Sequence, residues 1–304
     1  MPSNLDGEKE AKGKLFVVST PIGNLADITL RALDTLRSVD LVAAEDTRRT
    51  RKLLSYYDIH KPLISYHEHN ARERGSELLE AINSGRSVAL VTDAGTPGIS
   101  DPGKLLIEEA LHRGMEPVAI PGPTALISAL SVSGLQTRPF IFLGFPPARG
   151  ALRKRFFEEH ACLTMTLILY ESPKRLERTL EEMLKVWGDR RAAIARELTK
   201  MHEEIFRGTV SEAVAHFKTE VRGELTLVVD GAGAGSVGGR RDGPQSEESS
   251  LCHRDPAAWK DELKALLDGG SSSREAASVV AARFNLARRT VYQAALAIRK
   301  QNGC

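Results

Sequence analysis

The chain has 304 residues, of which 41% are hydrophobic and 27% charged, and its formal net charge is +2. This composition is typical of a globular protein with two or more domains. No run of about 20 uncharged apolar residues is present, which argues against a membrane-spanning helix. Residues 1–13 are polar and mixed in charge and lack the apolar core of a secretory signal. We expect them to be a disordered leader. Three widely separated cysteines argue against a disulfide framework, so we expect a cytoplasmic protein.

The charge is unevenly distributed along the chain. Residues 257–304 carry eight Lys or Arg against four Asp or Glu, whereas the residues before them carry 34 against 36. A basic excess confined to one end is expected where that end meets a polyanion. A solvated helical bundle would show the same charge, so both interpretations stay open.

Strands and helices alternate between residues 14 and 135. Short apolar runs that end in turn-forming residues predict four buried strands, at 14–20, 39–44, 87–92 and 117–120. A helical segment follows each of them, for example 104–113. The alternation predicts an α/β lobe with a parallel sheet covered on both faces, which binds ligands at the carboxyl ends of its strands.

The pattern changes near residues 135–137, where we place a domain boundary. A second α/β lobe is predicted over residues 136–230, with a helix at 176–186. Its predicted strands are at 139–144, 164–170, 192–196 and 223–229.

The rest of the chain is predicted to be a flexible linker followed by a helical domain. Residues 231–256 are rich in Gly and Ser and have no periodicity, whereas residues 257–304 have helical spacing. Two short helices, at 274–283 and 288–299, would be joined by a turn at 284–286 and so resemble a helix-turn-helix. Short helical hairpins are common, so this pattern alone is weak support for nucleic-acid binding.

Three Gly- and Pro-rich loops at strand ends are the candidate ligand-binding segments: PIGN at 21–24, DAGTPGISDPG at 93–103 and PGPT at 121–124. Glycine allows the backbone to approach a ligand closely, and proline reduces the entropy lost on binding. Asp93 or Asp101 could hold ribose hydroxyls or a cationic centre. Neither a dinucleotide fingerprint nor a phosphate-binding loop of the Walker type is present.

These loops resemble those of the S-adenosylmethionine-dependent tetrapyrrole methylase superfamily, and most closely its RNA-modifying branch, the ribosomal RNA small subunit methyltransferase I family. Eight stretches carry the resemblance in order along residues 14–230: STPIGNLADIT (19–29), AEDTRRTRKLL (44–54), SYHEHN (65–70), VTDAGTPGISDPG (91–103), IPGPTALISALSVSGL (120–135), YESPKR (170–175), RELTK (196–200) and GELTLVV (223–229). The resemblance implies an α/β, two-lobed tetrapyrrole-methylase-like fold with a C-terminal helical domain.

The resemblance also implies an activity and a cofactor site. The expected reaction is 2′-O-methylation of a cytidine in the decoding region of 16S rRNA, within the small ribosomal subunit, by a homodimer. S-adenosyl-L-methionine is expected in a cleft between the lobes. The residues expected to line it are Pro21, Asp93, Ala94, Gly95, Thr96, Ile99, Ser100, Pro121, Gly122, Thr124, Ala125 and Tyr170.

The chain departs from the pattern of the family at two places. The family usually has a His where Lys174 stands, and a GFLP-type segment followed by a Lys where this chain reads GFPPAR at 144–149. Both departures bear on contacts with the substrate more than on the methyl donor.

Three carboxylates are candidate general bases for a ribose hydroxyl, with Asp101 and Glu171 ahead of Glu45, because each follows a predicted strand. Two structural alternatives stand beside this hypothesis. Asp101 could cap the helix that begins near Gly103, and Glu171 could pair with Arg175 one helical turn later.

Basic clusters are the candidate RNA contacts, although such clusters are usually solvated helix faces. The residues concerned are Arg48, Arg49, Arg51, Lys52, Arg153, Lys154, Arg155, Lys174, Arg175, Arg288 and Arg289. His67, Glu68 and His69 are not expected to bind a metal, because no further ligand stands at suitable spacing.

Two other functions remain open at this point. A methylase of small tetrapyrroles would share the fold and the donor, but the basic helical domain argues against it. A non-catalytic RNA-binding factor in ribosome assembly would use the cleft only for regulation, and the intact cleft loops argue against it.

Overall fold

A computed structural model describes residues 13–218, 221–233, 258–268, 271–284 and 288–301. The chain divides near residue 237 into two compact units. The predicted leader lies outside the described residues except for Gly13, and so does most of the predicted linker.

The first unit begins with a parallel five-stranded sheet in the order β3-β2-β4-β1-β5. Its strands are β1 (Leu15–Val18), β2 (Leu41–Ala44), β3 (Leu63–Ser65), β4 (Val88–Val91) and β5 (Val118–Ile120). The prediction of a parallel sheet is confirmed. It missed β3, a half-buried strand of three residues at the edge of the sheet.

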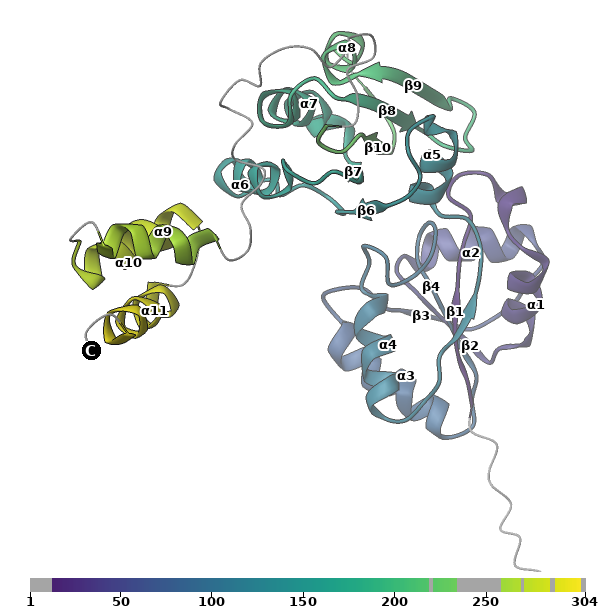
Figure 1. Cartoon of the computed structure of the whole chain (residues 1–304). Coiled ribbons are helices and arrows are strands. Elements are labelled where there is room, and N and C mark those ends of the chain that lie inside the picture. The colour runs from purple at the N-terminus through teal and green to yellow at the C-terminus, as the bar shows by residue number, and fades with distance from the viewer. Residues whose placement is uncertain (1–12, 219–220, 234–257, 269–270, 285–287, 302–304) are drawn as a thin grey trace, which may run out of the picture. The chain divides into compact units, whose positions relative to one another are not determined.

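Helices cover both faces of this sheet, as Figure 1 shows. They are the short 3-10 helix η1 (Leu25–Asp27) and the α-helices α1 (Leu30–Ser38), α2 (Thr47–Tyr56), α3 (Ala71–Asn83) and α4 (Gly103–His112). Alternate residues of β4 serve the two cores: Val88 and Leu90 pack with α3 and α4, whereas Ala89 and Val91 pack with α1 and α2. The strand is therefore apolar along its whole length, as in other doubly covered sheets.

The second sheet is mixed and has the order β6-β7-β10-β8-β9. Its β6 and β7 are parallel and the other neighbours are antiparallel. The strands are β6 (Phe140–Phe142), β7 (Thr166–Glu171), β8 (Arg191–Arg196), β9 (Glu204–Thr209) and β10 (Leu225–Val229). One face is covered by α6 (Gly150–His160), α7 (Pro173–Trp187) and α8 (Val210–His216).

Helix α5 (Ala125–Ser133) covers the other face of the second sheet. Its Ala129 and Leu130 are buried against Ile168, Ala193 and Val228. Helix α5 therefore belongs to the core of the second sheet, although it precedes the predicted boundary at residues 135–137. Helical spacing identifies the helix but does not say which sheet it packs on.

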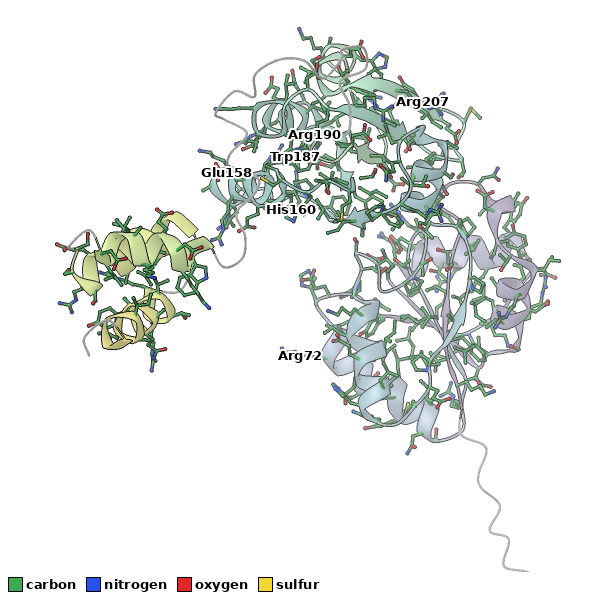
Figure 2. All side chains as sticks on the ribbon, viewed as in Figure 1. Arg72, Glu158, His160, Trp187, Arg190 and Arg207 are labelled. Atoms are coloured by element: carbon green, nitrogen blue, oxygen red, sulfur yellow. The ribbon has the colours of Figure 1, made fainter. Side chains whose placement is uncertain are left out.

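An aromatic contact joins the helices that cover the second sheet. The indole N–H of Trp187 donates to the carbonyl of Phe157 at 2.7 Å, and the Arg190 guanidinium lies 5.5 Å from the centre of the indole ring. Figure 2 shows Trp187 and Arg190 close together at the end of α7. This contact ties α6 to α7, whose first residue, Pro173, lines the cavity described below.

The second unit contains α9 (Ala258–Asp268), α10 (Ser273–Phe284) and α11 (Arg288–Gln301). They share a small core that includes Leu263, Ala277 and Val291. Helices occur where they were predicted, but most of the predicted turn at 284–286 lies outside the described residues. None of the helices within the described residues has the length and apolar character needed to cross a membrane.

The packing of α5 predicts a difference between two substitutions on that helix. Leu130→Ala removes a side chain that is 5% exposed, so the free energy of unfolding should fall by about 2–5 kcal/mol. Ile127→Ala removes one that is 47% exposed and should change it by less than about 0.5 kcal/mol. Urea denaturation measures both, and equal stabilities would contradict the placement of α5.

Candidate active site

A cavity of about 340 Å³ lies between the two sheets of the first unit. The carboxyl ends of the parallel strands form one wall, as their topology predicts. Twelve residues proposed from the sequence as cofactor or catalytic residues line it: Glu45, Asp93, Ala94, Gly95, Thr96, Ile99, Ser100, Asp101, Thr124, Ala125, Tyr170 and Glu171. The cavity is also lined by Ile22, Arg49, Thr92, Phe145, Ser172, Pro173, Ala195, Leu198, Gly223, Glu224, Leu225 and Thr226.

Direct bonds hold the first two loops of this wall together. Thr20 and Gly95 exchange backbone hydrogen bonds of 2.9 and 3.1 Å, and the hydroxyls of Ser19 and Thr96 are 2.8 Å apart. Gly95 has a φ of +85°, a conformation that favours glycine. The 93–103 loop is therefore shaped before any ligand arrives.

Three residues expected at the cofactor do not line the cavity: Pro21, Pro121 and Gly122. Gly122 lies close to the end of β1, where only a glycine fits. A Cβ on Gly122 would lie 2.7 Å from the Cβ of Ser19, so a larger residue would separate the first and third loops. Gly122 therefore supports the lining rather than forming it.

Three carboxylates crowd the wall at the strand ends. Glu45 accepts the Thr92 hydroxyl at 2.6 Å, and Asp93 accepts the N–H of Asp46 at 3.0 Å. Burial and the neighbouring charge of Glu45 raise the pKa of Asp93. Like charges in a partly buried wall are costly, and a cationic ligand would relieve that cost.

Asp101 accepts a bond from the first residue of α4, as in its structural alternative, although the N-cap position itself is Pro102. Its Oδ1 accepts the N–H groups of Gly98 and Gly103, both at 2.8 Å, at the start of α4. Burial nonetheless raises the pKa of Asp101 above its usual range, against the effect of these bonds. The carboxylate is thus fixed in place and is a stronger base than an ordinary aspartate.

Glu171 is buried and already has partners. Its Oε1 lies 3.2 Å from Nε of Arg175 and accepts the N–H of Ser172 at 2.8 Å. Its Oε2 accepts the Thr179 hydroxyl, and that hydroxyl accepts from Arg153, both at 2.5 Å. The pairing with Arg175 that the sequence left open is therefore what the structure contains.

Arg153 is a correction to the expected RNA contacts. Its side chain is 1% exposed, and its Nε lies 2.9 Å from the carboxylate of Glu182 on α7. A guanidinium buried in this way cannot reach a phosphate without leaving its partners. The adjacent Lys154 and Arg155 are exposed and pair with Glu158 and Glu159.

The wall from the second lobe carries two aromatic residues, Tyr170 on β7 and Phe145 in the segment before α6. Tyr170 packs against Phe142 and Phe145, with ring centroids 4.8 and 5.6 Å away. Arg175 donates to the carbonyl of Pro146, so the atypical GFPPAR segment is tied to the start of α7. The side chain of Lys174, the other departure, is exposed and does not line the cavity.

The remaining wall comes from two loops to which no role was assigned from the sequence. The ammonium of Lys200 bridges the carboxylates of Glu197 and Glu224 at 2.8 and 3.0 Å. The bridge holds the loop after β8 against the turn before β10, and Leu198 and Gly223 face the cavity from there. The sequence did contain a signal for this wall, because RELTK (196–200) and GELTLVV (223–229) are among the stretches that carry the family resemblance.

This wall is also joined to the first loop of the first lobe. The N–H of Asn24 donates to the Thr199 hydroxyl at 3.0 Å. A Cβ on Gly23 would lie 2.8 Å from the carbonyl oxygen of Leu198 and 2.5 Å from Cγ of Lys200. The two lobes therefore meet where only glycine fits.

The other proposed RNA contacts lie on helix surfaces. Arg48 pairs with Asp46 at 2.8 Å and lowers the pKa of that carboxyl, whereas Arg49 lies 3.4 Å from Asp93 at the cavity. Seven other proposed RNA contacts are also exposed: Arg51, Lys52, Lys154, Arg155, Lys174, Arg288 and Arg289.

The histidines of the 65–70 stretch are close but form no metal centre in this part of the chain. The rings of His67 and His69 are 5.9 Å apart. Over the residues that the structure describes, no three His, Cys, Asp or Glu side chains are placed to hold a metal ion together.

The buried network around Arg153 predicts a stability effect that an RNA contact would not produce. Arg153→Met leaves the carboxylate of Glu182 without its cationic partner and removes the donor to the Thr179 hydroxyl that bonds to Glu171. The free energy of unfolding should therefore fall by about 3–5 kcal/mol. Lys154→Met, at an exposed site, should cost less than about 0.5 kcal/mol. Urea denaturation followed by circular dichroism compares them, and equal midpoints would contradict the buried role.

Comparisons with known proteins agree with this architecture. Residues 14–214 match the family described as Tetrapyrrole (Corrin/Porphyrin) Methylases. Among solved structures of this fold, a diphthine synthase has a TM-score of 0.58 at 15% identity and covers 72% of this chain and 90% of its own. The uroporphyrin-III C-methyltransferase from Thermus thermophilus, complexed with S-adenyl homocysteine, has a TM-score of 0.53 at 20% identity, covering 72% and 97%.

Curated relatives are much closer in sequence. The ribosomal RNA small subunit methyltransferase I of Thermotoga maritima is 52% identical over 220 residues, which are 72% of this chain and 99% of that protein. The protein of the same name from Bacillus subtilis is 42% identical over 287 residues, 94% and 95% of the two chains. The chain therefore belongs to the tetrapyrrole methylase family and, within it, to the ribosomal RNA small subunit methyltransferase I family.

Proposed function

We propose that this chain transfers a methyl group from S-adenosyl-L-methionine to the ribose 2′-hydroxyl of a cytidine in the decoding region of 16S rRNA. The observation that carries the proposal is the acidic cavity at the strand ends, in a chain of this family. The methyl donor would occupy the cavity and the acceptor ribose would enter at its mouth. The homodimer that the resemblance implies stays a prediction.

The cavity residues fit the proposed donor. A volume of about 340 Å³ lies in the range of small-molecule sites. Ile22, Ile99 and Leu198 offer apolar surface to an adenine ring, while Asp93 offers acceptors to ribose hydroxyls. The lining includes five carboxylates and one guanidinium, which suits a positively charged molecule. When bound there, the donor supplies an electrophilic methyl group on a sulfonium centre.

Positioning is the main contribution that we assign to the protein. Alignment of reacting groups can supply up to about 7–11 kcal/mol, whereas a general base typically adds about 10²–10⁴-fold in rate. Among the three candidate carboxylates, Asp101 is favoured as the group that takes the hydroxyl proton, because it lines the cavity and two backbone N–H groups fix its Oδ1, and burial also raises its pKa. Glu171 ranks last, because Arg175 and Thr179 already hold it.

RNA would be held by cations on both units of the chain. Arg49 stands at the cavity, and Arg51 and Lys52 lie on the exposed side of the same helix. Arg48, Lys154, Arg155, Lys174, Arg175, Arg288 and Arg289 complete the proposed set, and the affinity should fall with salt. Neither a small-tetrapyrrole acceptor nor a purely structural role in ribosome assembly is favoured, since the full-length relatives carry the rRNA methyltransferase name.

The direct test is transfer of radiolabelled methyl from S-adenosyl-L-methionine to small ribosomal subunits that lack the modification, with mapping of the product. We expect label on the ribose of a decoding-region cytidine. Label on another nucleotide, or none on RNA despite measured donor binding, would refute the acceptor that we propose.

Amide variants test the general base. Asp101→Asn keeps the Oδ1 acceptor of the cap and should slow single-turnover methylation by about 10²–10⁴-fold if the carboxylate takes the proton. Glu45→Gln and Glu171→Gln serve as matched comparisons and should have smaller effects. Near-wild-type rates in all three variants would refute the general-base hypothesis, and positioning of the substrates would then be the whole contribution of the protein to the rate.

A further inference from the structure

Helix α2 carries an unbalanced charge. Its ten residues, TRRTRKLLSY, include four Lys or Arg and neither Asp nor Glu. Arg48 and Arg49 pair with carboxylates outside the helix, at Asp46 and Asp93. Arg51 and Lys52 are exposed and have no ion pair within the described residues. The exposed side of α2 is therefore a cationic surface that begins at the cavity.

One stripe of this helix runs from the cavity to an aromatic residue. Buried Thr50, Leu53 and Leu54 face the sheet. Positions 49, 52 and 56 are spaced i, i+3 and i+7, so a helix places their side chains on one face, turned away from that core. At about 1.5 Å per residue, Tyr56 lies roughly 10 Å further along the helix than Arg49. Cavity, cation and aromatic ring thus follow one another in a line.

Tyr56 is exposed and yet supported. Its side chain is 66% exposed, although it is a large aromatic group. Its ring meets that of Tyr57 edge to face, with centroids 4.9 Å apart and planes at 82°. Tyr57 is itself anchored, because its hydroxyl donates to the carbonyl of Leu25 at 2.5 Å. Tyr56 is therefore held against a fixed neighbour while much of its surface remains open to solvent.

We propose that Tyr56 is a stacking platform for a base of the single-stranded RNA segment that flanks the acceptor nucleotide, and that this segment leaves the cavity along the Arg49–Lys52–Tyr56 stripe. The proposal rests on the proposed function for the identity of the acceptor. Cations that follow the backbone, with an aromatic ring that accepts any base, are the combination by which proteins hold single-stranded nucleic acid. The charge of α2 favours this occupant over an apolar protein surface.

The platform predicts a specific loss of binding. Affinity for a short fluorescent single-stranded RNA of decoding-region sequence should fall about 5- to 150-fold in Tyr56→Ala, the range for loss of one stacked base. Tyr56→Phe keeps the ring and should bind as the wild type does. Leu30→Ala, which removes another exposed apolar side chain from the same face of the lobe, is the matched control and should have no effect.

The contribution of Lys52 to RNA binding can be measured separately, through the salt dependence of the affinity. Lys52→Ala should reduce the slope of log affinity against log salt concentration by about 0.7, the value for one phosphate contact on a single strand. With small subunits as substrate, Tyr56→Ala should raise KM for the subunit and leave the affinity for S-adenosyl-L-methionine unchanged. Gel filtration with light scattering of the wild type and Tyr56→Ala shows whether the ring instead contacts a second copy of the chain.

The outcomes separate this inference from the proposed function. If the wild type methylates small subunits but Tyr56→Ala binds RNA and reacts as the wild type does, the platform is refuted and the function stands. A change of oligomeric state in Tyr56→Ala with unchanged RNA affinity also refutes it. If Tyr56→Ala weakens RNA binding and the wild type places no methyl on rRNA, the platform stands and the proposed function falls.

Discussion

The site depends on a close contact between two loops, one from each lobe, whose sheets have separate cores. Gly23 packs on the loop after β8 so tightly that a Cβ would lie 2.8 Å from both the Leu198 carbonyl oxygen and the Thr199 hydroxyl. Thr199 has a φ of +65°, which costs a residue other than glycine roughly 1–2 kcal/mol. Its N–H bond to Glu203 and its hydroxyl bond to Asn24 offset that cost. Backbone strain of this kind is common at ligand clamps, and here it lies where the two halves of the cavity meet.

Electrostatics gives the cavity its character once the two walls are in place. Carboxylates at strand ends crowd together, and burial raises the pKa of both Asp93 and Asp101. Glu171 and Glu224, by contrast, have Arg175 and Lys200 as partners. The first wall sets three carboxylates, Glu45, Asp93 and Asp101, against the one guanidinium of Arg49, so its net charge stays negative, whereas the carboxylates of the second wall serve the structure. The charged residues of α2, which begins at the cavity, are all cationic, and this separates a site for a cation from a surface for a polyanion.

Much of this arrangement could be predicted from the sequence, and the exceptions have physical reasons. Apolar runs and turn residues located most strands, and the loop at 93–103 was identified as a wall because parallel strands bring their ends together. The three-residue β3 and the half-buried β9 gave no clear pattern. The wall at Leu198 and Gly223 depends on how two sheets meet, which local patterns do not encode. Arg153 was misjudged although a signal was present, because Phe157 one turn later is apolar and buried and marks that face as internal.

The contact at Gly23 offers the most direct test of the account, because it separates the fold of each lobe from the cavity between them. Calorimetric titration of S-adenosyl-L-methionine into the full chain should show measurable binding, and Gly23→Ala should weaken it by at least about tenfold, or 1.4 kcal/mol, by moving one wall away from the other. Gly75→Ala is the matched control, because its Cβ would meet Tyr66 at an ordinary 3.8 Å. Unchanged affinity in Gly23→Ala, with both variants folded, would contradict the claim that the joined lobes form the cofactor site.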